Sequence, residues 1–133
     1  PEAQVVLPLT RSSLAEPMVE VARGGSLTGW SPEFREGCAL ITVLASGGYP
    51  TSYETGFPIR IPSDLEDETL RIFHAGTARS GGRLVTAGGR VLGITGLGED
   101  LEAAGARSRR GAELIEFEGK HWRRDIGAAG VDG

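Results

Sequence analysis

The residues in this sequence best suited to chemistry are two adjacent arginines near its carboxyl end, Arg123 and Arg124, which Asp125 follows. A guanidinium group is a planar fork of donors that can hold a phosphate or a carboxylate at two points. The pattern therefore predicts a site for a small anionic molecule. The alternative is that both arginines pair with Asp125, Glu116 or Glu118 in a solvated surface network, which contributes little to stability.

Pairs of glycines mark two turns that could also line a binding site. One pair lies in the run Ser46-Gly47-Gly48-Tyr49-Pro50, and the other is Gly88-Gly89. Neither matches the phosphate-binding loop, which also requires a lysine and a hydroxyl residue. Because each pair is explained by its turn alone, a binding role for Gly48, Tyr49, Gly88 and Gly89 stays open at this point.

The sequence offers no other familiar catalytic or metal-binding pattern. A single cysteine, Cys38, and two separated histidines, His74 and His121, make neither a zinc spacing nor a nucleophile–base pair. The net charge of −4 argues against nucleic acid as a partner, because nucleic-acid platforms are normally basic. No apolar run is long enough to span a bilayer. Together with the single cysteine, this predicts a cytoplasmic protein without a membrane partner.

The apolar pattern predicts the elements that would position these residues. A helix is expected over residues 9–23, where Pro17 either marks a later start or produces a kink. Residues 38–45 form a continuous apolar run, typical of a strand buried on both faces. Further short strands are expected at 70–75, 83–86 and 90–96, with one more at 59–61 as an option. The run Ser80-Gly81-Gly82-Arg83 predicts a tight hairpin.

The carboxyl-terminal third is expected to hold a helix over 99–115, although Gly105 and Gly111 weaken it by about 1 kcal/mol each. A short edge strand is predicted over 117–124, and in such a strand Arg123 and Arg124 would point to opposite faces. Together these elements predict an α+β domain, a short antiparallel β meander with two flanking helices.

Several segments carry a resemblance to a known family when they are taken in order: Pro1-Glu2-Ala3-Gln4, residues 44–50, Phe73-His74-Ala75-Gly76-Thr77, residues 84–93, Phe117-Glu118-Gly119 and Arg123-Arg124-Asp125-Ile126-Gly127. They resemble the carboxy-terminal part of the phosphoribosylamine–glycine ligases, which are ATP-grasp enzymes of purine biosynthesis. The resemblance implies a reaction in which ATP activates glycine as an acyl phosphate that the amine of 5-phosphoribosylamine captures. ATP and Mg²⁺ or Mn²⁺ are the implied cofactors of the intact enzyme.

The resemblance also implies which functional residues lie in this chain and which lie in the missing domains. The family's metal ligands lie upstream of Pro1, so this chain is expected to hold no metal ligand or catalytic residue, to bind no cofactor tightly and to be inactive alone. Its expected partners are glycine, 5-phosphoribosylamine and the missing amino-terminal and ATP-grasp domains. One of Arg123 and Arg124 is expected to bind the substrate phosphate with Asp125 orienting it, and the turns with Gly48, Tyr49, Gly88 and Gly89 to line the same cleft.

The expected organisation has three parts. Residues 1–30 would end the ATP-grasp domain with its helix and connector, 31–127 would form the carboxy-terminal ligase domain, and 128–133 would be a disordered tail. An exposed apolar patch around Val5, Val6 and Leu7 would mark where the missing domain packs. The alternative is a free-standing, non-catalytic α+β module for binding a small molecule or docking.

Overall fold

The computed structural model describes residues 1–128, so the predicted tail lies outside the described residues apart from Ala128. A three-stranded antiparallel sheet forms the centre of the molecule. Its strands are β1 (Cys38–Ala45), β5 (Arg90–Gly98) and β2 (Leu70–His74), in the spatial order β1-β5-β2. The predicted α+β class and antiparallel pairing are confirmed. The strands do not follow one another as in a sequential meander, because β5 lies between two strands that precede it.

β5 occupies the middle of the sheet because both of its faces are covered. Every residue from Val91 to Leu97 is buried. β1 alternates between buried and half-buried positions over most of its length, and in β2 only Leu70 is buried. The prediction for β1 is confirmed in its bounds, but only one of its faces is fully buried. Leu40, Thr42 and Leu44 lie on that face, and Ile41 and Val43 on the other are half-buried.

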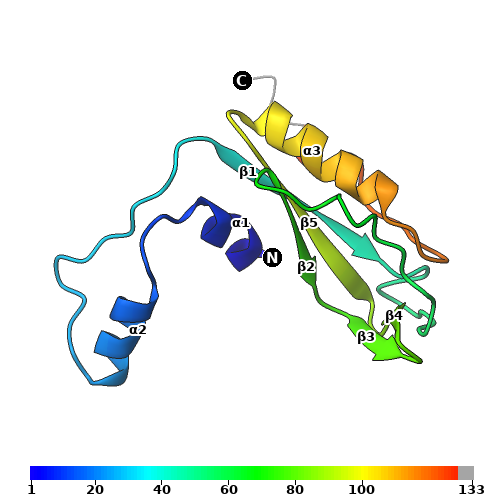
Figure 1. Ribbon diagram of the computed structural model, residues 1–133, viewed down its shortest axis with the longest axis horizontal. Helices are drawn as coiled ribbons and strands as arrows, with labels where there is room; N and C mark the ends of the chain where they lie inside the picture. Colours follow the sequence, from blue (N-terminus) through cyan, green and yellow to red (C-terminus); the bar gives the residue numbers. More distant parts are fainter. Residues whose placement is uncertain (129–133) are drawn as a thin grey trace.

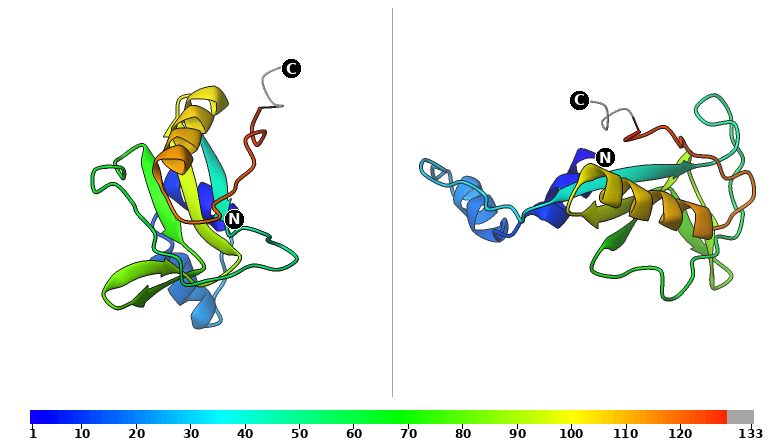
Figure 2. Two further views of the ribbon diagram at one scale, coloured as in Figure 1. Left: turned by 90° about the vertical axis from the view of Figure 1, so that its right-hand side faces the viewer. Right: turned by 90° about the horizontal axis from the view of Figure 1, so that it is seen from above.

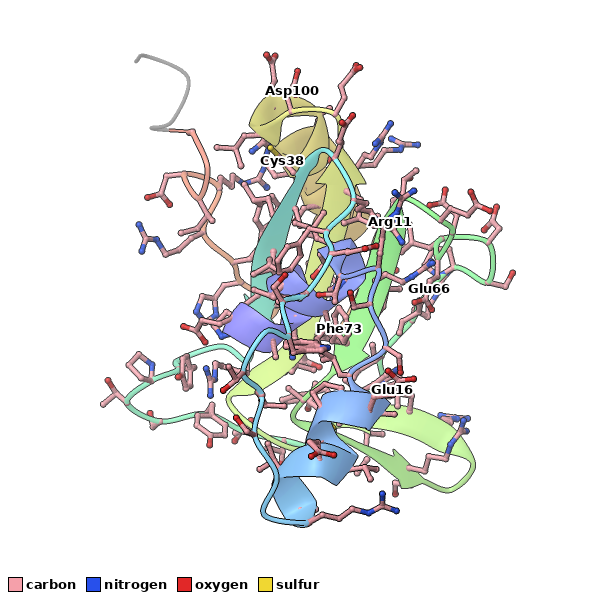
Figure 3. All side chains as sticks on the ribbon, turned by 90° about the vertical axis from the view of Figure 1, so that its left-hand side faces the viewer. Arg11, Glu16, Cys38, Glu66, Phe73 and Asp100 are labelled. Carbon is pink, nitrogen blue, oxygen red and sulfur yellow. The ribbon has the colours of Figure 1, made fainter. Side chains whose placement is uncertain are left out.

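The helix α3 (Leu101–Leu114) covers one face of the sheet, as predicted for 99–115 (Figure 1). Asp100 caps its amino end, where the carboxylate accepts a hydrogen bond from the Ala103 amide at 2.7 Å. Asp100 and Cys38, the first residue of β1, lie at the same end of the sheet (Figure 3). The main core forms under α3 from Leu44, Leu70, Ile94, Ala112, Ile115 and their neighbours.

The helix α1 (Glu2–Leu9) lies against the opposite face of the sheet (Figure 2). Gly93 lies under α1, and a Cβ there would lie 2.6 Å from the Gln4 side-chain oxygen and 2.8 Å from the end of the Ile41 side chain. The Thr95 hydroxyl donates to the Gln4 carbonyl at 2.9 Å. Neighbouring residues of a strand point to opposite faces of the sheet. Gly93 and Thr95 therefore face α1, and Gly96 faces α3.

The prediction of a single helix over residues 9–23 is wrong about where the helix begins. The chain leaves α1 at Leu9, pairs as an isolated bridge between Thr10 and Phe34, and forms α2 over Ala15–Ala22. Pro17 stands in the first turn of α2, where the missing amide costs no helical hydrogen bond. α2 therefore starts later than the apolar pattern suggested, and it stands away from the sheet (Figure 1).

The glycine hairpin is confirmed. The strands β3 (Thr77–Ser80) and β4 (Arg83–Thr86) pair across the two-residue loop Gly81-Gly82. Both glycines have positive φ, +55° and +77°, which is the conformation that such a loop requires. β3 and β4 form a separate two-stranded sheet.

The edge strand predicted over 117–124 is wrong. The chain turns at Gly119, whose φ is +72°, and the Lys120 amide donates back to the Phe117 carbonyl. This turn prevents an extended run, so only His121 pairs, as an isolated bridge to Ala45. The optional strand at 59–61 is likewise reduced to isolated bridges, among them Arg60 to Glu116.

Candidate functional site

A hollow of about 520 Å³ lies beside β1 on the face of the sheet that carries α1. Its floor is apolar because Ile41, Val43 and Ala45 all project to that side of the alternating strand. The rings of Tyr49 and Trp122 also line it. A mostly apolar hollow with a few polar groups on its wall is the usual form of a small-molecule site.

The polar wall of this hollow comes from pairing across three segments. Ala45 is the register partner of Arg90 in β5 and, on its other side, of His121 in the isolated bridge. The pairing of β1 with β5 shifts between Leu44 and Ala45, so Arg90 pairs with Ala45 at an irregularity of the ladder. Arg90 and His121 both line the hollow. Arg123, two residues beyond His121, lines it as well.

The Arg123 guanidinium makes a two-point contact with the Asp125 carboxylate. Nε lies 3.1 Å from Oδ1, and the second nitrogen lies 2.5 Å from Oδ2. The hydrogen bond to Asp125 raises the pKa of Arg123, and the same contact lowers the pKa of Asp125. Both side chains are about two-thirds exposed or more, at 72% and 65%, so the pair orients the guanidinium but adds little stability.

Arg124 turns away from this hollow. Its guanidinium lies over the Trp122 ring, 4.7 Å from the centroid, and one nitrogen lies 3.4 Å from the Glu113 carboxylate. With Lys120 it lines a separate hollow of about 340 Å³. The opposite directions predicted for the two arginines are found, although no strand produces them. The two guanidinium groups therefore do not converge on one position.

The two glycine turns lie side by side. The Ser46 hydroxyl donates to the Gly88 carbonyl at 2.9 Å, and the Ser46 amide donates to the Gly89 carbonyl at 2.8 Å. Tyr49 lies against Gly89 so closely that a Cβ there would collide with the ring. Of the predicted residues in these turns, Tyr49 lines the hollow and Gly89 supports its ring.

Gly48 and Gly88 contribute through their backbones. Gly48 has a φ of +87° and packs on the Ser52 carbonyl, and Gly88 packs against the backbone of Gly76. Both glycines are required by the turns that carry Tyr49 and Arg90 toward the hollow. The structure thus brings Arg123, Asp125, Tyr49 and Gly89 to one place and leaves Arg124 outside it.

Sequence reasoning missed three residues of the hollow: Arg90, His121 and Trp122. Arg90 directly follows the Gly88-Gly89 turn, and that turn was the one available signal. From sequence, His121 is a candidate only for a metal ligand or a base, and the spacing supports neither. Its place beside Ala45 depends on a bridge that no local pattern encodes.

Neither a metal-binding group nor a membrane-spanning helix is found in the part of the chain that the structure describes. Within residues 1–128, no group of three or more His, Cys, Asp or Glu side chains is arranged to hold a metal. None of the helices in that range has the length and apolar character that crossing a bilayer requires.

Comparison with known proteins shows which family this chain is similar to. Residues 39–129 match the family described as phosphoribosylglycinamide synthetase, C domain. The chain is 47% identical to phosphoribosylamine–glycine ligase of Chlorobaculum tepidum, over 96% of this chain and 30% of the relative. It is 40% identical to the trifunctional purine biosynthetic protein adenosine-3 of Gallus gallus, over 96% of this chain and 13% of the relative.

A solved structure agrees with these matches. The crystal structure of phosphoribosylamine–glycine ligase from Thermotoga maritima superposes with a TM-score of 0.81 at 40% identity. The match covers 95% of this chain and 30% of that one. The chain thus spans about a third or less of the length of the relatives it matches.

Proposed function

The chain belongs to the phosphoribosylglycinamide synthetase C-domain family, and from this membership we propose that it works as one domain of a phosphoribosylamine–glycine ligase. The proposed reaction joins glycine to 5-phosphoribosylamine with hydrolysis of ATP, giving glycinamide ribonucleotide. The observation that carries the proposal is the match along 96% of this chain to such a ligase at 47% identity. The superposition with the ligase of Thermotoga maritima supports it further.

Within the ligase, this domain contributes to the substrate cleft. Arg123 binds the phosphate of phosphoribosylamine, because its side chain lines the hollow and a guanidinium has five N–H donors, of which Asp125 engages two. Asp125 orients the guanidinium through its two contacts. Tyr49 forms a wall, Gly89 supports it, and Gly48 and Gly88 shape the turns behind it. Arg124 holds the carboxyl-terminal segment to α3 through Glu113.

ATP and the metal ion belong to other parts of the ligase in this proposal. A magnesium ion prefers carboxylate and water oxygens, and catalytic sites hold it with one or two carboxylates together with substrate phosphates. Within the described residues, no three His, Cys, Asp or Glu side chains are grouped to hold a metal ion, and in this proposal the metal ligands lie outside this chain. The domain's own task is to bind and orient an anionic substrate, while phosphoryl transfer takes place on residues outside this chain.

Exposed apolar side chains support the presence of neighbouring domains. Val6 and Leu7 of α1 are 47% and 48% exposed, in the patch where the sequence predicted that another domain packs. Met18 of α2 is 65% exposed. A helix of eight residues is marginal on its own in water, so α2 needs a packing partner. We assign that partner to the remaining domains of the ligase.

The proposed function is tested by measuring glycinamide ribonucleotide formation with ATP, glycine and phosphoribosylamine. The intact protein that contains this chain should catalyse the reaction, and residues 1–133 alone should not. Turnover by residues 1–133 alone would show that the catalytic groups lie within this chain. An intact protein that makes no product would refute the ligase assignment and leave a binding or docking module as the function.

A further inference from the structure

We propose that Arg90 is a second ligand for the anionic group held by Arg123, so that two guanidinium groups on neighbouring walls of the hollow bind one phosphate. The inference rests on the proposed function, since it names a further binding residue of the same site. Both arginines line the hollow of about 520 Å³ beside β1. They come from distant parts of the sequence, the first residue of β5 and the carboxyl-terminal segment.

The backbone holds Arg90 firmly at this place. On one side its register partner is Ala45 of β1, and on the other its carbonyl accepts a hydrogen bond from the Gly76 amide at 2.8 Å. Gly76 lies so close that a Cβ there would come within 2.7 Å of the Arg90 carbonyl oxygen. The root of the side chain is therefore positioned before any ligand arrives, which lowers the entropy lost on binding.

The charges around the hollow leave Arg90 without an ion pair. The pKa of Glu2 is lowered mainly by its backbone hydrogen bond and the amino terminus, and Arg90 adds a weaker attraction. Arg123 contacts Asp125, and Arg124 contacts Glu113 and the Trp122 ring. Among the ion pairs formed by the described residues, none includes Arg90, whose side chain is exposed. An arginine that lines a hollow and forms none of these pairs can present its full set of donors to a ligand.

The combination favours a phosphate monoester over a carboxylate. A phosphate monoester carries up to two negative charges and three terminal oxygens, so it can accept from two guanidinium forks at once. A carboxylate carries a single negative charge, so it balances the charge of only one of the two guanidinium groups. The apolar floor of Ile41, Val43 and Ala45 leaves the bound anion few competing polar groups. The ligand class is therefore a small phosphate monoester, and phosphoribosylamine belongs to it.

Four single variants of the intact ligase and one double variant test this inference. The single variants are Arg90→Ala, Arg90→Lys, Arg123→Ala and, as the matched control, Arg83→Ala, and the double variant combines Arg90→Ala with Arg123→Ala. Arg83 is an exposed arginine of the β3–β4 hairpin, outside the hollow. Two quantities are measured, the KM for phosphoribosylamine and the equilibrium binding of ribose 5-phosphate as a stable phosphate monoester. The KM for ATP and the melting temperature show whether a variant is otherwise intact.

Arg90→Ala should raise the KM for phosphoribosylamine and weaken ribose 5-phosphate binding, each by about ten- to a hundred-fold. This is the usual loss for a charge-assisted hydrogen bond. Its kcat at saturating substrate should change little, because the phosphate does not react. Arg90→Lys keeps the charge but lacks the fork of donors, so its KM and its binding of ribose 5-phosphate should lie between those of the wild type and Arg90→Ala. This variant preserves the test if Arg90→Ala folds poorly. Arg83→Ala should match the wild type. In the double variant Arg90→Ala/Arg123→Ala, the two effects should not simply multiply, because both act on one phosphate.

The possible failures are distinguishable. If Arg123→Ala weakens ribose 5-phosphate binding and both Arg90 variants bind like the wild type, the role of Arg90 is refuted and the proposed site stands. If the intact protein makes no product, the ligase function fails, but ribose 5-phosphate binding still decides the role of Arg90. An Arg83→Ala variant as weak as Arg90→Ala would reduce the effect to overall charge and overturn the inference.

Discussion

A single carboxylate, Asp67, holds the loop that leads into β2. One of its oxygens accepts from the Thr69 amide at 2.6 Å, from the Thr69 hydroxyl at 2.8 Å and from the Leu70 amide at 2.9 Å. The bond from the Thr69 amide is the main reason that the pKa of Asp67 is lowered. Glu66 beside it, labelled in Figure 3, accepts from the Ile72 amide at 3.2 Å. Both carboxylates therefore accept from amides of β2.

Asp67→Asn should lower the melting temperature at neutral pH, and the gap to the wild type should close in acid. A carboxyl whose folded pKa lies below its unfolded value, about 3.9 for aspartate, stabilises the fold above that value. The contribution is lost as pH falls through the folded pKa. Thermal unfolding between pH 2 and pH 7 tests this, with Asp64→Asn in the same loop as the control. A gap that is the same at every pH would show that the Asp67 charge plays no part.

Arg123 and Arg90 differ in how far their positions could be predicted from sequence. Arg123 and Asp125 are two residues apart, so their pairing was one of the alternatives that the sequence itself raised. Arg90 reaches the same hollow only through its register with Ala45, in a strand far away in sequence. Register depends on how whole strands pack, and a local pattern of residue types carries no information about it.

Two glycines, Gly96 in β5 under α3 and Gly105 within α3, differ in the space that a side chain would find. Gly96 of β5 faces α3, and a Cβ there would collide with the Ala104 carbonyl and lie 2.6 Å from the Ser108 amide. Both contacts are with backbone, which cannot move aside. Gly105 lies within α3, and a Cβ there would meet only the end of the Arg109 side chain, at 2.9 Å. That flexible side chain can rotate away.

Gly96→Ala should therefore destabilise the protein by about 1–3 kcal/mol through overpacking. Gly105→Ala should be neutral or stabilising by up to about 1 kcal/mol, because alanine favours the helix more than glycine does. Chemical denaturation of both variants gives the comparison, and each serves as the control for the other. Equal effects in the same direction would contradict the packing described for α3 against β5.

The elements with strong local signals were predicted well. β1, the glycine hairpin and α3 follow from an apolar run, a turn dipeptide and an amphipathic pattern, which are properties of adjacent residues. The division between α1 and α2 and the turn at Gly119 could not be predicted in this way. Both depend on contacts with the sheet, since α1 is held by Thr95 and the carboxyl-terminal segment by Ala45.

The molecule as a whole distributes its exposed apolar side chains unevenly. Most of the large ones lie in α1, α2 and the connector that follows, including Val6, Leu7, Met18, Val21, Trp30 and Phe34. The sheet and α3 bury nearly all of theirs in one core. The division of the chain at residue 30 remains a prediction, although α1 packs on the sheet of the second part. This distribution fits a domain whose amino-terminal third is covered by other parts of a longer protein.

The central claim is that this domain supplies a phosphate-binding arginine to the substrate cleft of a ligase, and the KM for phosphoribosylamine in the intact enzyme tests it most directly. Arg123→Ala should raise that KM by about ten- to a hundred-fold and leave the KM for ATP unchanged. Arg124→Ala, its neighbour in the other hollow, should change neither value appreciably. Wild-type kinetics for Arg123→Ala, or an equal effect of both variants, would contradict the account.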